Sequence, residues 1–251
     1  MLEHIERLIA LEDVEAVWAL HCERMAAYGF DRLVYGFSRF VTAPGFGNPE
    51  DNLVLSNHEK AYLDEFIGNG LFGDAPMVRW STDHVGACSW GWAAARAAAG
   101  LLTPAEIRVL EFNRRHGVLA GYSIAFPDSS SRAKGGIGLC ARRGLDQEAV
   151  DAIWAEQGRE IMLLNALMHL KITTMPFPTS RRKLTKRQRE VLEWVADGKT
   201  TADIALLLDL TPGTIEKHLR LAREALDVET TAQAVLKASL QRQIFLNLPR
   251  G

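Results

Sequence analysis

The sequence predicts an α+β fold in two parts: an N-terminal α-β-α sandwich with an antiparallel sheet, and a C-terminal all-α domain of four helices containing a helix-turn-helix. Three observations predict it. In "GYSIAFPDSSSRAKGGIGLCAR" (121–142) a Ser/Gly-rich turn joins two β-like runs, as in a hairpin. Stretches with helical apolar spacing lie on both sides of that hairpin. From residue 184 onward, helix-start signals recur at short intervals.

The elements of the first part follow in order. Apolar residues at helical spacing predict helix within 1–30, and "FDRLVYGFSRFV" (30–41) alternates like a strand. In "LTPAEIRVLEFNRRHG" (102–117), Thr103 can cap a helix, Pro104 suits its first turn and Glu106 completes a capping box. The apolar stripe of 146–172 predicts a long helix, and it is broader than one sheet face requires. We therefore expect that helix to supply much of a homodimer interface.

A boundary lies in "TTMPFPTSRRK" (173–183), where two prolines separated by one residue favour extended chain. We predict a first domain over 1–172, a linker over 173–183 and a second domain over 184–251. Residues 1–177 hold 16 Lys+Arg against 22 Asp+Glu, a balance of −6, whereas 178–251 hold 13 against 9, a balance of +4; together they give the net −2. A basic part of this kind attracts a polyanion such as DNA.

Four helices are predicted in the second part. Thr185 with Gln188 and Thr230 with Gln233 form capping boxes for the first and the last, and a second covers about 201–208. A third begins at Thr211 and Pro212. On the third helix the spacing turns three residues inward and leaves four charged ones outside, as in a helix-turn-helix. The inward residues are Ile215, Leu219 and Ala222, and the outward ones are Glu216, Lys217, Arg220 and Arg223.

Several classes of protein are excluded. The three widely spaced cysteines fit neither a disulfide framework nor a metal site, and no secretory or membrane-spanning stretch is evident, so we expect a cytoplasmic protein without metal or cofactor. "GKTT" lacks the earlier glycine of a phosphate loop and "GGIGLC" lacks the third glycine of a dinucleotide loop. The predicted antiparallel sheet argues against the parallel α/β receiver domain of phosphorelay regulators.

Residues 184–244 resemble the DNA-binding domain of the LuxR family of bacterial transcription regulators. The motifs "LT-x-R", "VL-x-W-x-A-x-GKT", "IA" and "T-I-x-x-H" occur in the family's order and spacing. The resemblance implies a homodimer on a palindromic site in double-stranded DNA, with RNA polymerase as a further partner. It implies that Lys217 and Arg220 face the major groove. The candidate DNA-binding residues are Lys199, Thr200, Thr211, Thr214, Glu216, Lys217, His218 and Arg220. The alternative is a helical bundle whose charges are merely solvated.

The stretch "HEKAYLDEFIGNGLFGDAPMVRW" (58–80), with "GACSW" (86–90) and "GVLAG" (117–121), resembles the acyl-homoserine-lactone-binding domain of quorum-sensing LuxR regulators. On this resemblance Tyr62 donates to the lactone carbonyl, Asp74 accepts from the ligand amide, and Trp90 and Phe66 wall the ring. The candidate ligand-binding residues are Tyr62, Asp74, Trp90, His58, Phe66 and Ser123. The expected lining of the acyl chain is Ile124, Phe126 and Leu139. Three departures are the His58, Tyr62 and Phe66 side chains, where the family has Tyr, Trp and Tyr.

These observations predict a ligand-responsive transcription regulator that senses a small-molecule autoinducer. Two alternatives stay open. In one, the front domain binds a different small molecule or none, with Phe66 as a core residue and Asp74 as a turn residue. In the other, Cys88 and His84, four residues apart, serve an enzyme, although no third orienting group is evident.

Overall fold

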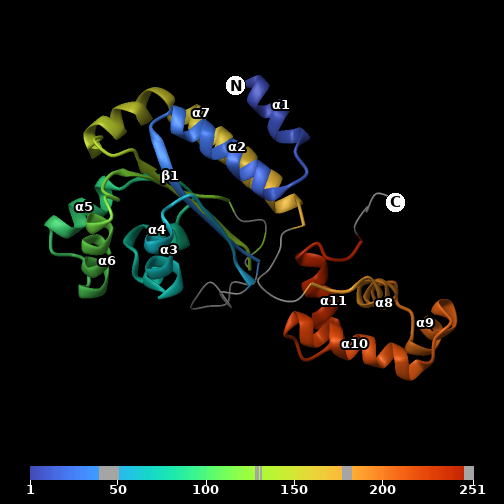
Figure 1. The fold of residues 1–251 in the computed structure, drawn as a ribbon. Coiled ribbons are helices and arrows are strands. Elements are labelled where there is room, and N and C mark those ends of the chain that lie inside the picture. Colours follow the sequence, from blue (N-terminus) through green and yellow to red (C-terminus); the bar gives the residue numbers. More distant parts are fainter. Residues whose placement is uncertain (40–50, 128–129, 131, 177–182, 246–251) are drawn as a thin grey trace. The chain divides into compact units, whose positions relative to one another are not determined.

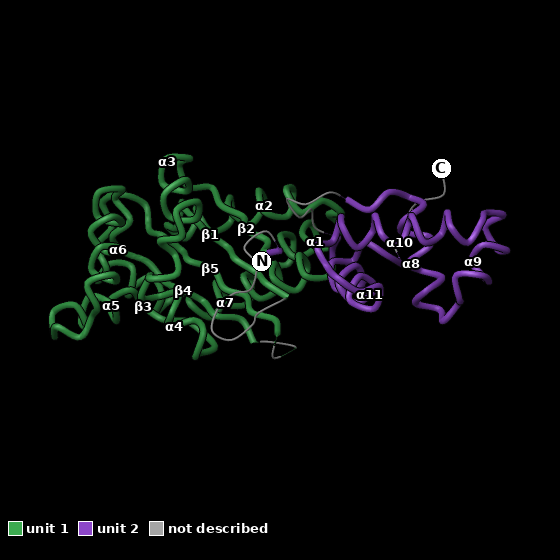
Figure 2. The backbone as a smooth tube through the Cα atoms, turned by 90° about the horizontal axis from the view of Figure 1, so that it is seen from below, with its two compact units in different colours: residues 1–47, 52–174 green, residues 48–51, 175–251 purple. Residues whose placement is uncertain are grey.

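The computed structural model describes residues 1–39, 51–127, 130, 132–176 and 183–245. The chain forms two compact units (Figure 2). Unit 1 comprises residues 1–47 and 52–174, and unit 2 comprises residues 48–51 and 175–251. Of the linker expected over 173–183, the first two residues belong to a helix that ends at Thr174, and 177–182 lie outside the described residues.

Unit 1 is built on a five-stranded antiparallel sheet in the order β2-β1-β5-β4-β3. The strands are β1 (Phe30–Ser38), β2 (Leu53–Ser56), β3 (Gly86–Ser89), β4 (Gly121–Ala125) and β5 (Lys134–Ala141). The predicted hairpin of β4 and β5 is confirmed, and β1 falls within the strand predicted at 30–41.

Two helices cover one face of the sheet, α2 (Val14–Ala27) and the long α7 (Gln147–Thr174), and α1 (Leu2–Ala10) packs against α7 (Figure 1). The predicted N-terminal helical stretch is thus two helices. Leu11 is extended, and Asp13 caps α2 by accepting from the Ala16 backbone N–H at 2.9 Å.

Shorter helices lie on the opposite face (Figure 1). They are α3 (Lys60–Leu63), a π-helical turn η2 (Asp64–Gly68), a 3-10 turn η3 (Leu71–Asp74), α4 (Pro76–Asp83), α5 (Gly91–Ala98) and α6 (Pro104–Arg115). The predicted capping box of α6 is present: Thr103 accepts from the Glu106 N–H, and the Glu106 carboxylate accepts from the Thr103 N–H at 2.8 Å. The first part is therefore the predicted α-β-α sandwich.

Unit 2 consists of the four predicted helices, α8 (Lys186–Ala196), α9 (Thr201–Leu208), α10 (Pro212–Leu226) and α11 (Thr231–Leu240). Capping boxes begin α8, α9 and α11, and Thr211 caps α10. Their shared core includes Val191, Leu192, Ile204, Ile215, Leu219, Ala222 and Leu226. Among the described residues, no helix is both long and apolar enough to cross a membrane.

Candidate functional site

A stack of aromatic rings lies in unit 1 on the side of the sheet that carries the shorter helices α3 to α6. Tyr62 is 4% exposed, and its ring stacks on His58, Phe66 and Phe112 at centroid distances of 4.5, 5.1 and 5.2 Å. The prediction that His58 shares one helix with the other two is wrong, because α3 begins only at Lys60. His58 nevertheless reaches Tyr62 from the loop that precedes the helix.

Helix α6 completes this stack with residues that the sequence did not single out. The Tyr62 hydroxyl donates to Oδ1 of Asn113 at 3.1 Å, and the His116 ring meets Tyr62 edge-on at 5.5 Å. Burial raises the pKa of Tyr62, so the phenol keeps its proton and remains a donor. The signal for this set was the i, i+4 spacing of Phe112 and His116 on the predicted helix 102–117.

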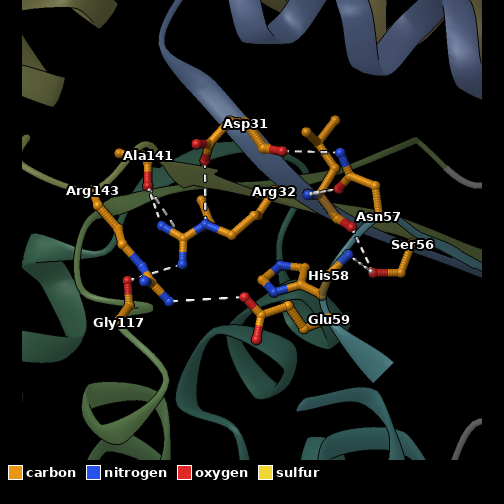
Figure 3. Close-up of polar contacts among 11 residues, drawn as sticks. Asp31, Arg32, Ser56, Asn57, His58, Glu59, Gly117, Ala141 and Arg143 are labelled. Carbon is orange, nitrogen blue, oxygen red and sulfur yellow. Dashed lines mark hydrogen bonds and ion pairs between the residues drawn. The ribbon is translucent and has the colours of Figure 1, made fainter. Parts of the chain in front are cut away.

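Arg32 organises the backbone around His58 (Figure 3). Its guanidinium donates to the carbonyls of Gly117 at 3.0 Å and Ala141 at 2.6 Å, and its side chain is only 14% exposed. Burial, reinforced by the positive charge of Arg32, lowers the pKa of His58 from 6.5 to about 4. His58 is therefore neutral at physiological pH, and its ring can serve a ligand as a single donor or a single acceptor.

Trp90 and Ser123 form a second polar pair on the same side of the sheet. The Trp90 indole N–H donates to the Ser123 hydroxyl at 2.9 Å. Gln147, at the start of α7, holds the neighbouring backbone: its amide donates to the Gly121 carbonyl at 3.2 Å and to the Ser89 hydroxyl at 3.0 Å. Trp90 also packs against the apolar cluster that contains Tyr62 and Phe66. Both polar pairs therefore border one cluster.

The expected lining of the acyl chain by Ile124, Phe126 and Leu139 is wrong for this side of the sheet. Side chains alternate along a strand, so Ile124 points away from the face that carries Ser123. Leu139 is paired with Tyr122, which stacks on Trp154 of α7 at 3.9 Å. Phe126 stacks on His169, also of α7, at 4.1 Å. All three belong to the core beneath α7.

Asp74 is the candidate that stands apart. It lies exposed at the end of η3, directly before Ala75, which is buried in the same cluster as Tyr62 and Phe66. The backbone of Asp74 therefore borders the site. The structure thus brings together His58, Tyr62, Phe66, Trp90 and Ser123 around one cluster, with Asp74 at its exposed edge.

Cys88 and His84 are not arranged as a catalytic pair. The Cys88 thiol donates to the Ser89 carbonyl, and burial raises the pKa of Cys88, which disfavours the thiolate needed for attack. His84 follows α4, where its ring Nδ1 donates to the Trp80 carbonyl at 2.8 Å and its ring stacks on the Trp80 ring at 4.8 Å. Within the described part of the chain, no group of three His, Cys, Asp or Glu residues is placed to hold a metal.

The predicted DNA-contacting side chains of unit 2 lie on or beside α9 and α10. Ile215, Leu219 and Ala222 are buried as predicted, which leaves the opposite side of α10 to solvent. All eight candidates are exposed or half-buried: Lys199, Thr200, Thr211, Thr214, Glu216, Lys217, His218 and Arg220. Thr200 and Thr211 are the N-caps of α9 and α10, so each marks a helix N-terminus, a position suited to phosphate.

Hydrogen bonds distinguish the charged residues of α10. Glu216 accepts from the Thr201 hydroxyl at 2.9 Å, which ties α10 to α9, and Arg220 pairs with Glu224 at 2.5 Å on the helix surface. Arg223 was expected to point outward, but it is half-buried and donates to the Thr231 hydroxyl of α11 at 2.9 Å. Arg223 thus joins two helices of unit 2.

Two families match this chain. Residues 13–172 match the autoinducer binding domain, and residues 182–238 match the bacterial regulatory proteins of the luxR family. The quorum sensing-dependent transcriptional regulator RpaR of Rhodopseudomonas palustris is 28% identical and covers 91% of this chain and 92% of its own length. The transcriptional activator protein SolR of Ralstonia solanacearum is 34% identical and covers 84% of each chain.

Among solved structures, SdiA of Escherichia coli is similar over 96% of this chain and 95% of its own, with a TM-score of 0.55 and 18% sequence identity. A likeness at that identity shows the fold. It agrees with an antiparallel sheet flanked by helices in the first part and a helical second part.

Proposed function

The chain belongs to the luxR family of bacterial regulatory proteins and carries that family's autoinducer binding domain, and from this premise we propose that it is a quorum-sensing regulator whose unit 1 binds an acyl-homoserine lactone. The family is one of transcriptional regulators, not of enzymes. The observation that carries the proposal is the placement of Tyr62 and Trp90, each with a polar hydrogen, against one apolar cluster. Ligand sites of this kind combine apolar walls with a few oriented polar groups.

In the proposed complex, the Tyr62 hydroxyl donates to the lactone carbonyl in place of its bond to Asn113. The side chains of Phe66 and Trp90 pack against the lactone ring, and the neutral His58 contacts the ligand amide oxygen. Asp74 accepts from the ligand amide N–H in a charge-assisted bond. Ser123, already paired with Trp90, orients the indole or meets a polar group of the acyl chain.

For unit 2 we propose binding to a palindromic site in double-stranded DNA. Lys217 and Arg220, both exposed on α10, reach base edges or phosphates in the major groove. Lys199, Thr200 and Thr211 lie at or beside helix N-termini and are suited to phosphate contacts that position the helix. Thr214, Glu216 and His218 complete the proposed surface, and RNA polymerase is the proposed partner at the promoter.

A palindromic site calls for a homodimer. Two large apolar side chains of α7, Leu163 and Leu170, are 46% and 59% exposed and lie seven residues apart on the same side of the helix. Their exposure supports the proposal that α7 contributes to the dimer interface. We place this activity in the cytoplasm, where bacterial DNA is bound.

The binding of a lactone is tested by thermal unfolding of the purified chain with and without N-octanoyl-homoserine lactone. A ligand that binds only the folded state stabilises it, by about 2.7 kcal/mol at a concentration about 100 times Kd. We expect a rise in the unfolding temperature in the parent and little rise in Asp74→Asn. An Asp83→Asn protein, altered at an exposed carboxylate at the end of α4, is the control and should respond like the parent.

The exposure of Asp74 favours a second candidate, in which unit 1 binds a different small molecule and Asp74 is only a turn residue. Mass spectrometry of an organic extract of the protein purified from its native cells separates the two. A co-purified acyl-homoserine lactone supports the first proposal, and another co-purified small molecule supports the second.

A further inference from the structure

One carboxylate lies on the surface of α10 that is proposed to meet DNA. Glu216 is exposed, and Arg220, one helical turn further along, is exposed on the same side of the helix. Ile215 and Leu219 belong to the buried core of unit 2. The phosphates of DNA attract an arginine on such a surface, but they repel a carboxylate. A phosphate contact therefore does not explain why a glutamate stands at position 216.

Glu216 is not paired with the arginine beside it. A glutamate and an arginine four residues apart commonly form an ion pair on a helix. Here Arg220 pairs with Glu224 at 2.5 Å instead, and Oε1 of Glu216 accepts from the hydroxyl of Thr201 at 2.9 Å. Among the residues that the structure describes, no donor is placed at Oε2 of Glu216. The protein therefore holds one carboxylate oxygen, and the other can accept from a partner.

Thr201 gives this carboxylate a fixed anchor. It is the first residue of α9 and directly follows Thr200, whose hydroxyl accepts from the Asp203 N–H at 3.2 Å in a capping box. The N-terminus of a helix carries partial positive charge, which stabilises a nearby carboxylate. The Thr201 hydroxyl thus restricts the rotamers of Glu216 before DNA is bound. A side chain that is ordered in advance loses less conformational entropy on binding.

The chemistry of the major groove decides which base a carboxylate can read. Cytosine presents an amino group as a donor, whereas guanine presents acceptors and thymine presents an acceptor and a methyl group. Adenine also has an amino group, but the N7 acceptor beside it repels a carboxylate. We infer that Glu216, positioned by Thr201, selects a cytosine in each half of the DNA site. This inference rests on the proposed function, because it requires that α10 enters the major groove.

The test uses DNA selected from random sequences by the full chain, with each base pair of a half-site then replaced in turn, and fluorescence anisotropy at fixed salt. In the parent, replacing one particular cytosine should weaken binding by at least about fivefold. Glu216→Gln should move the preference at that position from cytosine to adenine, because an amide pairs with both N6 and N7 of adenine. The amide oxygen can still accept from Thr201, so this variant should unfold at the parental temperature.

Thr201→Val should reduce the preference for that cytosine, and Thr201→Ser, which keeps the hydroxyl, should retain it. Glu229→Gln removes an exposed carboxylate outside α10 and is the control, which should keep the parental base preferences. Parental preferences at every position in Glu216→Gln would overturn the inference, because Glu216 would then only join α9 to α10, while the proposed function would stand. Parental preferences in Thr201→Val would overturn the positioning role of Thr201. Failure of the parent to select any DNA sequence would overturn both the inference and the proposed function.

Discussion

The Tyr62 hydroxyl is held by one hydrogen bond, to Asn113, inside a stack of rings. Tyr62→Phe keeps the stack and deletes only that bond, so we expect a loss of about 1 kcal/mol in the free energy of unfolding. The stabilisation that the lactone gives, measured by thermal unfolding, should fall further below the parental value in Tyr62→Phe than in Tyr28→Phe. Tyr28 is a buried tyrosine whose hydroxyl accepts from Arg24, and it serves as the control. Equal responses in the two variants would remove Tyr62 from the binding site.

His58 makes the stability of unit 1 depend on pH. Its pKa is lowered to about 4 in the folded protein by burial and then by Arg32, so the unfolded chain binds more protons between that value and 6.5. The stabilisation is fully present above the unfolded pKa and is lost as the pH falls toward the folded one, by up to about 3 kcal/mol.

His58→Phe preserves a ring against Tyr62 without a titrating group. Its free energy of unfolding in urea should therefore decrease less between about pH 7 and about pH 5 than that of the parent. Some dependence should remain, because burial also lowers the pKa of His21 to about 4. His84→Phe, changed at an exposed ring, should keep the parental slope. A His58→Phe slope equal to the parental one would contradict the assignment.

The role of a single residue could be predicted where a sequence motif identifies it. It was harder to predict where the role depends on packing between distant elements. Tyr62, Phe66 and Trp90 were found from spacing and resemblance, and the structure places them around one cluster. Asn113 could not be found, because its role depends on the approach of α6 to α3. Ile124 was assigned to the wrong face because a strand pattern shows alternation but does not show which face the ligand-side helices cover.

At the scale of the elements, the stability of the helices of unit 2 depends on the residues that cap their N-termini. The Thr185 hydroxyl accepts from the Gln188 N–H, and the Gln188 side chain accepts from the Thr185 N–H at 2.8 Å. Thr185→Ala should lower the free energy of unfolding of unit 2 by about 1 kcal/mol, measured by thermal unfolding of the full chain. Lys186→Ala, at the exposed next residue, should change it little. Equal effects would mean that the cap is not what holds the start of α8.

Helix α10 gives a matched pair of arginines. Arg220→Ala should cost about 1–3 kcal/mol on a specific DNA site if Arg220 reads a base, measured by fluorescence anisotropy. Arg223→Ala should instead lower the unfolding temperature, because Arg223 joins α10 to α11, and leave specificity unchanged. A small loss for Arg220→Ala that is equal on all sequences would make Arg220 a phosphate contact.

Element boundaries were predicted best where side chains cap them. Thr103, Thr185, Thr211 and Thr230 each begin the predicted helix, because a hydroxyl that accepts from the first turn is a local property of the sequence. The break at Leu11 and the π-helical turn after Leu63 were not predicted, because apolar spacing alone continues through both. Sheet order was also out of reach, since it depends on pairing between distant strands.

For the whole molecule, the uneven charge of the two parts indicated a basic, DNA-binding C-terminal domain attached to an acidic N-terminal domain. The net charge of −2 hides this division, because 178–251 carry +4 and 1–177 carry −6. DNA binding by unit 2 should therefore weaken steeply as salt rises. The ligand and its chain length could not be predicted from composition. Composition does not show how distant strands pair, and the sheet register that shapes unit 1 appears only in the folded chain.

The central claim is that a lactone bound to unit 1 governs DNA binding by unit 2. Its most direct test is the Kd of the full chain for its operator DNA, selected from random sequences, with and without saturating N-octanoyl-homoserine lactone at fixed salt. Coupled sites typically change each other's affinity by about 5–150-fold, and the change is reciprocal. We predict a change in Kd of at least about fivefold, with an equal change in lactone affinity when DNA is bound. Identical values of Kd with and without a lactone that demonstrably binds would contradict the account.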